Sequence, residues 1–80
     1  MTVKTRLPLS KMKNSQSGTV IAINGGRAIC SKLGALGIQP GVKIVKKSRL
    51  IGSGPVIVSV GNTDIAIGYG MATRILVEVD

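Results

Sequence analysis

The amino-acid sequence predicts a mainly β protein, a small closed or partly closed β-barrel of about five strands with one short α-helix after the first strand. Its apolar content of 44% comes almost wholly from Val, Ile, Leu and Ala, and β-branched residues favour pleated, half-buried strands. Eleven glycines and three prolines indicate many sharp turns between short elements. Because so short a chain has room for one core only, we expect a single domain over residues 1–80.

Residues 1–17 are expected to form an adapter segment that packs on the barrel. Leu7 and Leu9 carry its apolar contacts, and the polar stretch after them contains Asn14, which is suited to a left-handed backbone conformation. Residues 18–24 follow as the first strand, because apolar side chains occupy both of its alternating faces. We therefore expect this strand to be buried on most of both sides.

A change in apolar spacing marks the one predicted helix. After a glycine turn, apolar residues recur at i, i+4 and i+7 over residues 27–36, which is the spacing of a single helical stripe. This stripe comprises Ile29, Leu33 and Leu36. Gly37 is placed to end the helix in a left-handed conformation, and Pro40 and Gly41 then predict a tight turn.

Four further strands are predicted from short apolar runs bounded by turn residues. They cover residues 42–50, 55–60, 64–68 and 74–79. Alternation is only partial in the first of these, so its second half is expected to be exposed and to twist away from the barrel. In the last, Ile75, Val77 and Val79 are expected to point inward, directly after one helical turn. Hairpin turns are expected at residues 52–55 and 61–62.

Short glycine-containing motifs occur in a distinctive order between Leu7 and Val79. They are Ser17-Gly18-Thr19-Val20, Asn24-Gly25-Gly26, Leu33-Gly34-Ala35-Leu36-Gly37-Ile38-Gln39-Pro40-Gly41, Gly54-Pro55-Val56, Ile65-Ala66-Ile67-Gly68 and Ala72-Thr73-Arg74-Ile75-Leu76-Val77. This order resembles the ferrous iron transport protein A (FeoA) family. The resemblance implies an SH3-like β-barrel that acts in the cytoplasm as an accessory to FeoB, a large membrane-embedded, GTP-hydrolysing iron(II) transporter.

The side chains that catalysis requires are scarce. The chain has no His and three carboxylates, two of which lie in its last three residues, so no acid–base pair can be assembled. Cys30 has no His to activate it and is expected to be a buried structural thiol. We therefore predict that the protein is not an enzyme and has no catalytic residues.

Metal and cofactor binding are also not predicted. Iron(II) prefers imidazole and carboxylate ligands, and a site needs three or more that converge. Asp64, Glu78 and Asp80 are too few and too scattered, and Met12 and Met71 are expected to fill gaps in the core. The glycine turns lack the Lys-Ser/Thr that completes a phosphate loop. The protein is thus expected to assist iron movement without holding iron.

Cysteine use and hydropathy predict a cytoplasmic location. A single cysteine allows no intramolecular disulfide, and the charged N-terminus is not followed by the apolar run of a secretory signal. The longest uncharged run, residues 50–63, is too short to span a membrane and is broken by glycine and proline. The inner face of the membrane is a further candidate location, as a peripheral protein.

A basic cluster in residues 43–49 is the most informative surface feature of the sequence. The net charge of +8 attracts acidic proteins, anionic lipid or nucleic acid. As lysines on an edge strand, the cluster needs no partner, because such residues discourage strand-to-strand aggregation. As a contact, it suits an acidic cytosolic face of FeoB or the anionic headgroups beside it, and a nearby isoleucine supplies an apolar centre. The predicted partner-binding residues are Ile38, Lys43, Lys46, Lys47 and Arg49.

Nucleic-acid binding is the alternative function, since small barrels of this type also bind RNA and the charge is suitable. Proteins that bind single strands present several aromatic side chains on which bases stack. Tyr69 is the only aromatic residue of this chain. The sequence therefore favours a protein-interaction module over a nucleic-acid binder.

Overall fold

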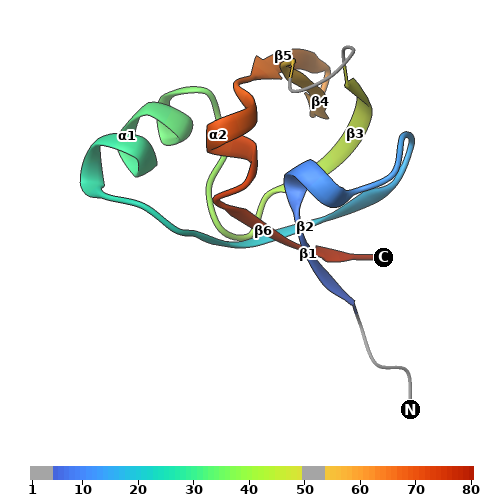
Figure 1. Ribbon diagram of the computed structural model, residues 1–80, viewed down its shortest axis with the longest axis horizontal. Coiled ribbons are helices and arrows are strands. Elements are labelled where there is room, and N and C mark those ends of the chain that lie inside the picture. The colour runs from blue at the N-terminus through green and yellow to red at the C-terminus, as the bar shows by residue number, and fades with distance from the viewer. Residues whose placement is uncertain (1–4, 50–53) are drawn as a thin grey trace.

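The structure, a computed structural model, describes residues 5–49 and 54–80, except for the side chains of residues 48 and 49. Within these residues six strands form one antiparallel sheet in the order β1-β6-β2-β3-β4-β5 (Figure 1). The strands are β1 (Arg6–Pro8), β2 (Ser17–Ile23), β3 (Lys43–Arg49), β4 (Val56–Val60), β5 (Thr63–Ile67) and β6 (Ile75–Val79). The helices are the 3-10 helix η1 (Leu9–Lys11), α1 (Arg27–Ala35) and α2 (Tyr69–Ala72). The prediction of a mainly β fold is confirmed, and the short helix expected after the first strand follows the second.

The hydrophobic core collects side chains from both ends of the chain. Strand β6 shows the alternation that builds it: Ile75 and Val77 are fully buried, whereas Leu76 and Glu78, at the alternate positions, are half-buried. The inward orientation predicted for this strand is confirmed. The buried apolar residues are Leu9, Met12, Val20, Leu33, Ile38, Ile44, Val56, Val58, Ile67, Ala72, Ile75, Val77 and Val79.

The N-terminal segment supplies a strand of the sheet. β1 pairs with β6, with Leu7 opposite Val77, and this pairing accounts for six strands where about five were expected. For the same reason α1 follows the second strand and not the first. Leu9, in η1, is fully buried, and Leu7 is half-buried against the core. Both leucines therefore make the contacts with the domain that their apolar character indicated.

The turn between η1 and β2 corrects one detail of the prediction. The left-handed conformation falls on Ser15, with φ of 69°, and not on Asn14. The backbone N–H of Gln16 donates to the carbonyl of Lys13 at 3.1 Å, which makes Ser15 the third residue of a four-residue turn. In a type II turn this is the position that requires a positive φ.

The C-terminal end of α1 buries Ile38. Gly37 has φ of 89°, as predicted, and its N–H donates to the Gly34 carbonyl, while the Ile38 N–H donates to the Leu33 carbonyl, both at 2.9 Å. This pair of hydrogen bonds is a Schellman motif, which brings the residue after the glycine back onto the helix. Leu33 and Ile38 are accordingly buried together, and Leu36, expected on the apolar stripe, is 42% exposed.

Strand β3 stays in the sheet along its whole length. It pairs with β4 as far as Arg49, and Lys46 is buried on the same face as Ile44. A bulge between Lys46 and Ser48 leaves Lys47 without a partner in the register. The expectation that the second half of this strand twists away from the barrel is therefore wrong, and so is the expected exposure of Lys46, whereas Lys47 is exposed as expected.

The connections after β3 are short. Gly61 has φ of 61° in the tight turn between β4 and β5, which confirms the hairpin predicted at residues 61–62. Most of the hairpin turn predicted at residues 52–55 lies outside the described residues. Among the residues that the structure describes, no helix is both long and apolar enough to cross a membrane.

Candidate interaction surface

The five residues predicted to bind a partner do not form one exposed surface. Lys43 and Lys47 are exposed, and Arg49 lies in β3 with its side chain outside the described part. Ile38 and Lys46 are only 1% and 4% exposed, so neither offers area to a partner. The predicted apolar centre is wrong because the Schellman motif turns Ile38 into the core. Lys43, Lys47 and Arg49 stay candidate contacts.

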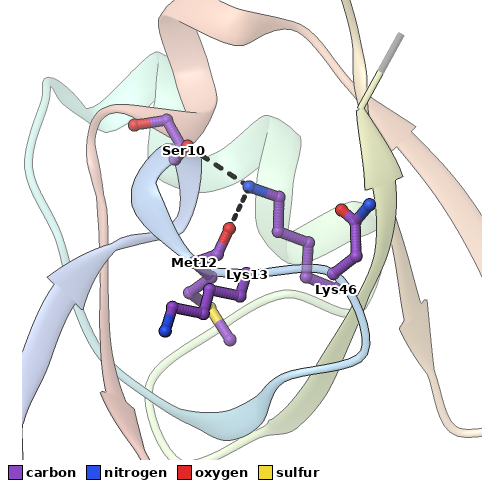
Figure 2. A pocket seen from close by; sticks show the side chains of 5 residues that line it. Ser10, Met12, Lys13 and Lys46 are labelled. Atoms are coloured by element: carbon purple, nitrogen blue, oxygen red, sulfur yellow. Dashed lines mark hydrogen bonds between the residues drawn. The ribbon is translucent and has the colours of Figure 1, made fainter.

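Lys46 is buried because its side chain and backbone both bond to the N-terminal segment (Figure 2). Its Nζ donates to the carbonyl of Ser10 at 3.2 Å and to the carbonyl of Met12. Its backbone N–H donates to the Gln16 carbonyl at 2.9 Å, and its own carbonyl accepts from the Ser15 N–H at 2.6 Å. Burial of a polar group is tolerated where it is hydrogen-bonded. We call these four hydrogen bonds the Lys46 clamp.

An open hollow of about 450 Å³ lies beside the clamp. Its lining residues are Ser10, Met12, Lys13, Asn14 and Lys46 (Figure 2). Lys11 and Lys13 are exposed on either side of the buried Met12, so the segment anchors through its methionine and presents both lysines to solvent. Lys13 extends away from the Lys46 amine in Figure 2. The hollow is therefore a concave, mainly polar surface with cations around it.

Sequence reasoning missed this surface, because it interpreted residues 11–17 as a polar turn from which only Met12 was expected to reach the core. The available signal was the alternation of Lys11 and Lys13 about Met12, which marks a segment held at one side only. The proximity of that segment to Lys46, more than thirty positions along the chain, could not be deduced from the sequence pattern.

The carboxylates are distributed unevenly over the described surface. Glu78 lies 3.8 Å from Arg6, and Asp80 lies 3.1 Å from Lys43 and accepts a hydrogen bond from Ser17 Oγ at 3.0 Å. These two carboxylates offset positive charge near β1, β6 and the start of β3. Lys11, Lys13 and Lys47 make no salt bridge with any described residue.

Metal and thiol chemistry find little support in the arrangement of these side chains. In the described residues no group of three or more His, Cys, Asp and Glu comes together. Cys30 is exposed, so its predicted role as a buried thiol is wrong. The reason is that α1 lies at the edge of the molecule and buries only Leu33, which leaves most of the helix in solvent (Figure 1).

Comparison with known proteins places this fold in a family. The FeoA domain family matches residues 7–79. The chain is 34% identical, in an alignment of 73 positions that covers 89% of the chain and 84% of the relative, to a protein of Methanocaldococcus jannaschii whose name provisionally describes it as an Fe(2+) transport protein A.

Solved structures of other proteins also match this fold. The crystal structure of an iron uptake regulatory protein (FeoA) matches with a TM-score of 0.87 and 37% identity, over 95% of this chain and 99% of that one. A manganese-dependent transcriptional repressor also matches with a TM-score of 0.87, but at 17% identity and over 45% of its length, so it shares the fold alone. By the family match and both FeoA relatives, the chain belongs to the FeoA domain family.

Proposed function

We propose that this protein is a cytosolic accessory component of a ferrous iron transport system and binds the cytosolic part of the GTP-dependent transporter FeoB. The observation that carries the proposal is the FeoA domain match over residues 7–79, together with relatives whose names refer to iron transport and iron uptake. As a member of a family of transport accessory proteins, the chain is not an enzyme. It acts by contact, through the assembly or the GTP-driven activity of its partner.

The surface chemistry is compatible with such a contact. Exposed lysines lie on the segment before β2 and on β3. Lys11, Lys13 and Lys47 form no ion pair with a described residue. Cations at the rim of an interface act mainly on the rate of association with an acidic partner. Three carboxylates, two of them already paired with cations, favour a protein that assists iron movement without holding iron.

Co-purification with the transporter encoded in the same genome tests the proposal. We expect the two proteins to form a complex in solution, and the complex to weaken as the salt concentration rises, because salt screens exposed charges. Failure of the unmodified protein to bind the transporter at any salt concentration would remove the proposed function.

Anaerobic titration with iron(II) tests the proposal that the protein acts without a bound metal ion. We expect no saturable site tighter than about micromolar, since a site needs at least three converging ligands. A tighter site that Asp64→Asn or Glu78→Gln abolishes would contradict the proposal.

Nucleic-acid binding is the second candidate, and the observation in its favour is the net charge of +8. Against it, Tyr69 is half-buried in α2 and is the only aromatic side chain. A mobility-shift assay at about 150 mM salt separates the two functions, because binding through phosphate contacts alone weakens steeply with salt. Submicromolar, sequence-selective binding of RNA at that salt concentration would favour this candidate over the first.

A further inference from the structure

Two groups of cations on the described surface differ in their surroundings. Arg6 and Lys43 each lie beside a carboxylate of the C-terminal strand region, at 3.8 and 3.1 Å. Lys11, Lys13 and Lys47 form a second group with no carboxylate within salt-bridge distance in the described residues, a property that they share with the exposed Arg27, Lys32 and Arg74. The second group therefore contributes more to the attraction of an acidic partner than its share of the net charge suggests.

The second group is also held in place. The Lys46 clamp ties the segment that carries Lys11 and Lys13 to β3, one residue before Lys47. Within the segment, the Lys13 N–H donates to Oε1 of Gln16 at 2.9 Å, and the Gln16 N–H donates back to the Lys13 carbonyl. A backbone fixed in this way loses little conformational entropy when a partner binds.

The hollow adds concave shape to this charge. It is lined by Lys13 and Asn14 at the surface and by the Lys46 amine beneath them. A concave surface with several cations around it concentrates their electric field on a ligand. The lysines and the Asn14 amide also supply hydrogen-bond donors. Carboxylates are the acceptors that fit this set of donors best among protein side chains.

We infer that the lysine hollow, lined by Lys13 and Asn14 over the Lys46 clamp and accompanied by the exposed Lys11 and Lys47 on the same two chain segments, is the surface that binds an acidic segment of the transporter's cytosolic part. This inference rests on the proposed function and gives it a location. The carboxylates of the segment lie against Lys11, Lys13 and Lys47, and one of them enters the hollow beside Asn14. Ile38 and Lys46 take no direct part, because the domain itself buries them.

A pair of matched double variants tests this location. Lys11→Gln with Lys13→Gln removes two charges from the lysine hollow, and Arg27→Gln with Lys32→Gln removes two from exposed positions on α1. Association with the cytosolic part of the transporter is measured at about 50 and 200 mM salt. We expect the hollow variant to associate about tenfold more slowly at the lower salt concentration and to lose much of its salt dependence, and the α1 variant to stay within about twofold of the unmodified protein.

Each outcome decides the inference. Equal losses of association rate in both double variants would show that only net charge matters. No loss of association rate in the hollow variant would place the contact elsewhere. Either result overturns the inference and leaves the proposed function standing. Absence of binding by the unmodified protein removes both.

The same variants, assayed with a single-stranded RNA oligonucleotide and with vesicles of anionic phospholipid, separate protein from other partners. If the hollow variant loses affinity for one of these while it binds the transporter normally, the inference is overturned. Thermal melts of both variants serve as the control that the domain is still folded.

Discussion

At the scale of single residues, Lys46 shows how a charged residue type becomes part of a core. Its Nζ satisfies two backbone carbonyls of the N-terminal segment, next to residues as apolar as Leu9 and Met12. A carbonyl that is buried without a donor is costly, so the lysine stabilises the segment through acceptors that no apolar side chain could satisfy.

Replacement of this lysine by methionine tests the clamp. Lys46→Met keeps the aliphatic stem but leaves the carbonyls of Ser10 and Met12 without their donor, so we expect a loss of about 1–3 kcal/mol in the free energy of unfolding. Lys47→Met at the exposed neighbouring position is the control and is expected to change stability by about 0.5 kcal/mol or less. Urea denaturation measures both, and equal stability of the two variants would refute the clamp.

Ile38 provides a second test at this scale. Because it is 1% exposed, Ile38→Ala is expected to destabilise the domain by about 2–5 kcal/mol through lost burial and the cavity left behind. Leu36→Ala, two residues earlier and 42% exposed, is expected to cost about 1 kcal/mol or less. Equilibrium unfolding would contradict this assignment if the exposed leucine proved the more costly to remove.

Residue type alone misled the sequence analysis at both positions. A lysine in a partly alternating strand suggests exposure, and an isoleucine in a turn suggests a contact surface. The burial of Lys46 depends on acceptors that lie 34 and 36 positions away, which no local pattern reports. The burial of Ile38 had a local signal, since an apolar residue directly after a left-handed glycine commonly packs back on its helix.

At the scale of elements, two glycines of α1 and its C-terminal cap predict effects of opposite sign. Gly37 has φ of 89°, so Gly37→Ala is expected to destabilise the domain by about 1–2 kcal/mol. Gly34 lies within the helix, and a Cβ there would meet nothing within 4 Å, so Gly34→Ala is expected to stabilise by about 0.5 kcal/mol. Thermal melts that moved in the same direction for both variants would contradict this account of the helix end.

Most elements could be predicted from the sequence because their side chains repeat with a clear period. The helix over Arg27–Ala35 and the strand over Ile75–Val79 are examples. The strand Arg6–Pro8 is not predictable from the sequence pattern, since three residues are too few for a period and its identity as a strand depends on β6. The bulge at Lys47 was also beyond prediction, because a bulge exists only relative to the partner strand.

At the scale of the whole molecule, the N-terminal segment is an integral part of the fold. A chain that begins at Ser17 would lack β1, the buried Leu9 and Met12, and the two backbone carbonyls that accept hydrogen bonds from Lys46 Nζ. Each of the two apolar side chains is worth about 2–5 kcal/mol, against a total stability of about 5–15 kcal/mol for a domain. We expect this shortened chain to show no cooperative thermal transition by circular dichroism, and a transition close to that of the full chain would contradict this expectation.

The net charge was evident from the sequence, but its distribution was not. The ion pair of Lys43 joins it to Asp80, 37 positions away, and Arg6 pairs with Glu78 near the other end of the chain. Only the folded sheet therefore separates cations that lie beside carboxylates from those of the lysine hollow. That distinction moves the candidate contact from the middle of β3 towards the segment before β2.

The position of β6 between β1 and β2 has a consequence for biosynthesis. Both partners of this strand are translated in the first third of the chain, whereas β6 itself is made only when residues 75–79 have been added. The β3-β4-β5 meander can pair as soon as it leaves the ribosome, because its strands are neighbours in sequence. Strand β2 can pair with β3 earlier, but β1 and the edge of β2 that faces β6 must wait, and contacts between such distant residues form slowly. We therefore expect the domain to complete its folding after residue 79 has emerged from the ribosomal exit tunnel, with Leu7, Val20 and the edges of β1 and β2 exposed to chaperones until then.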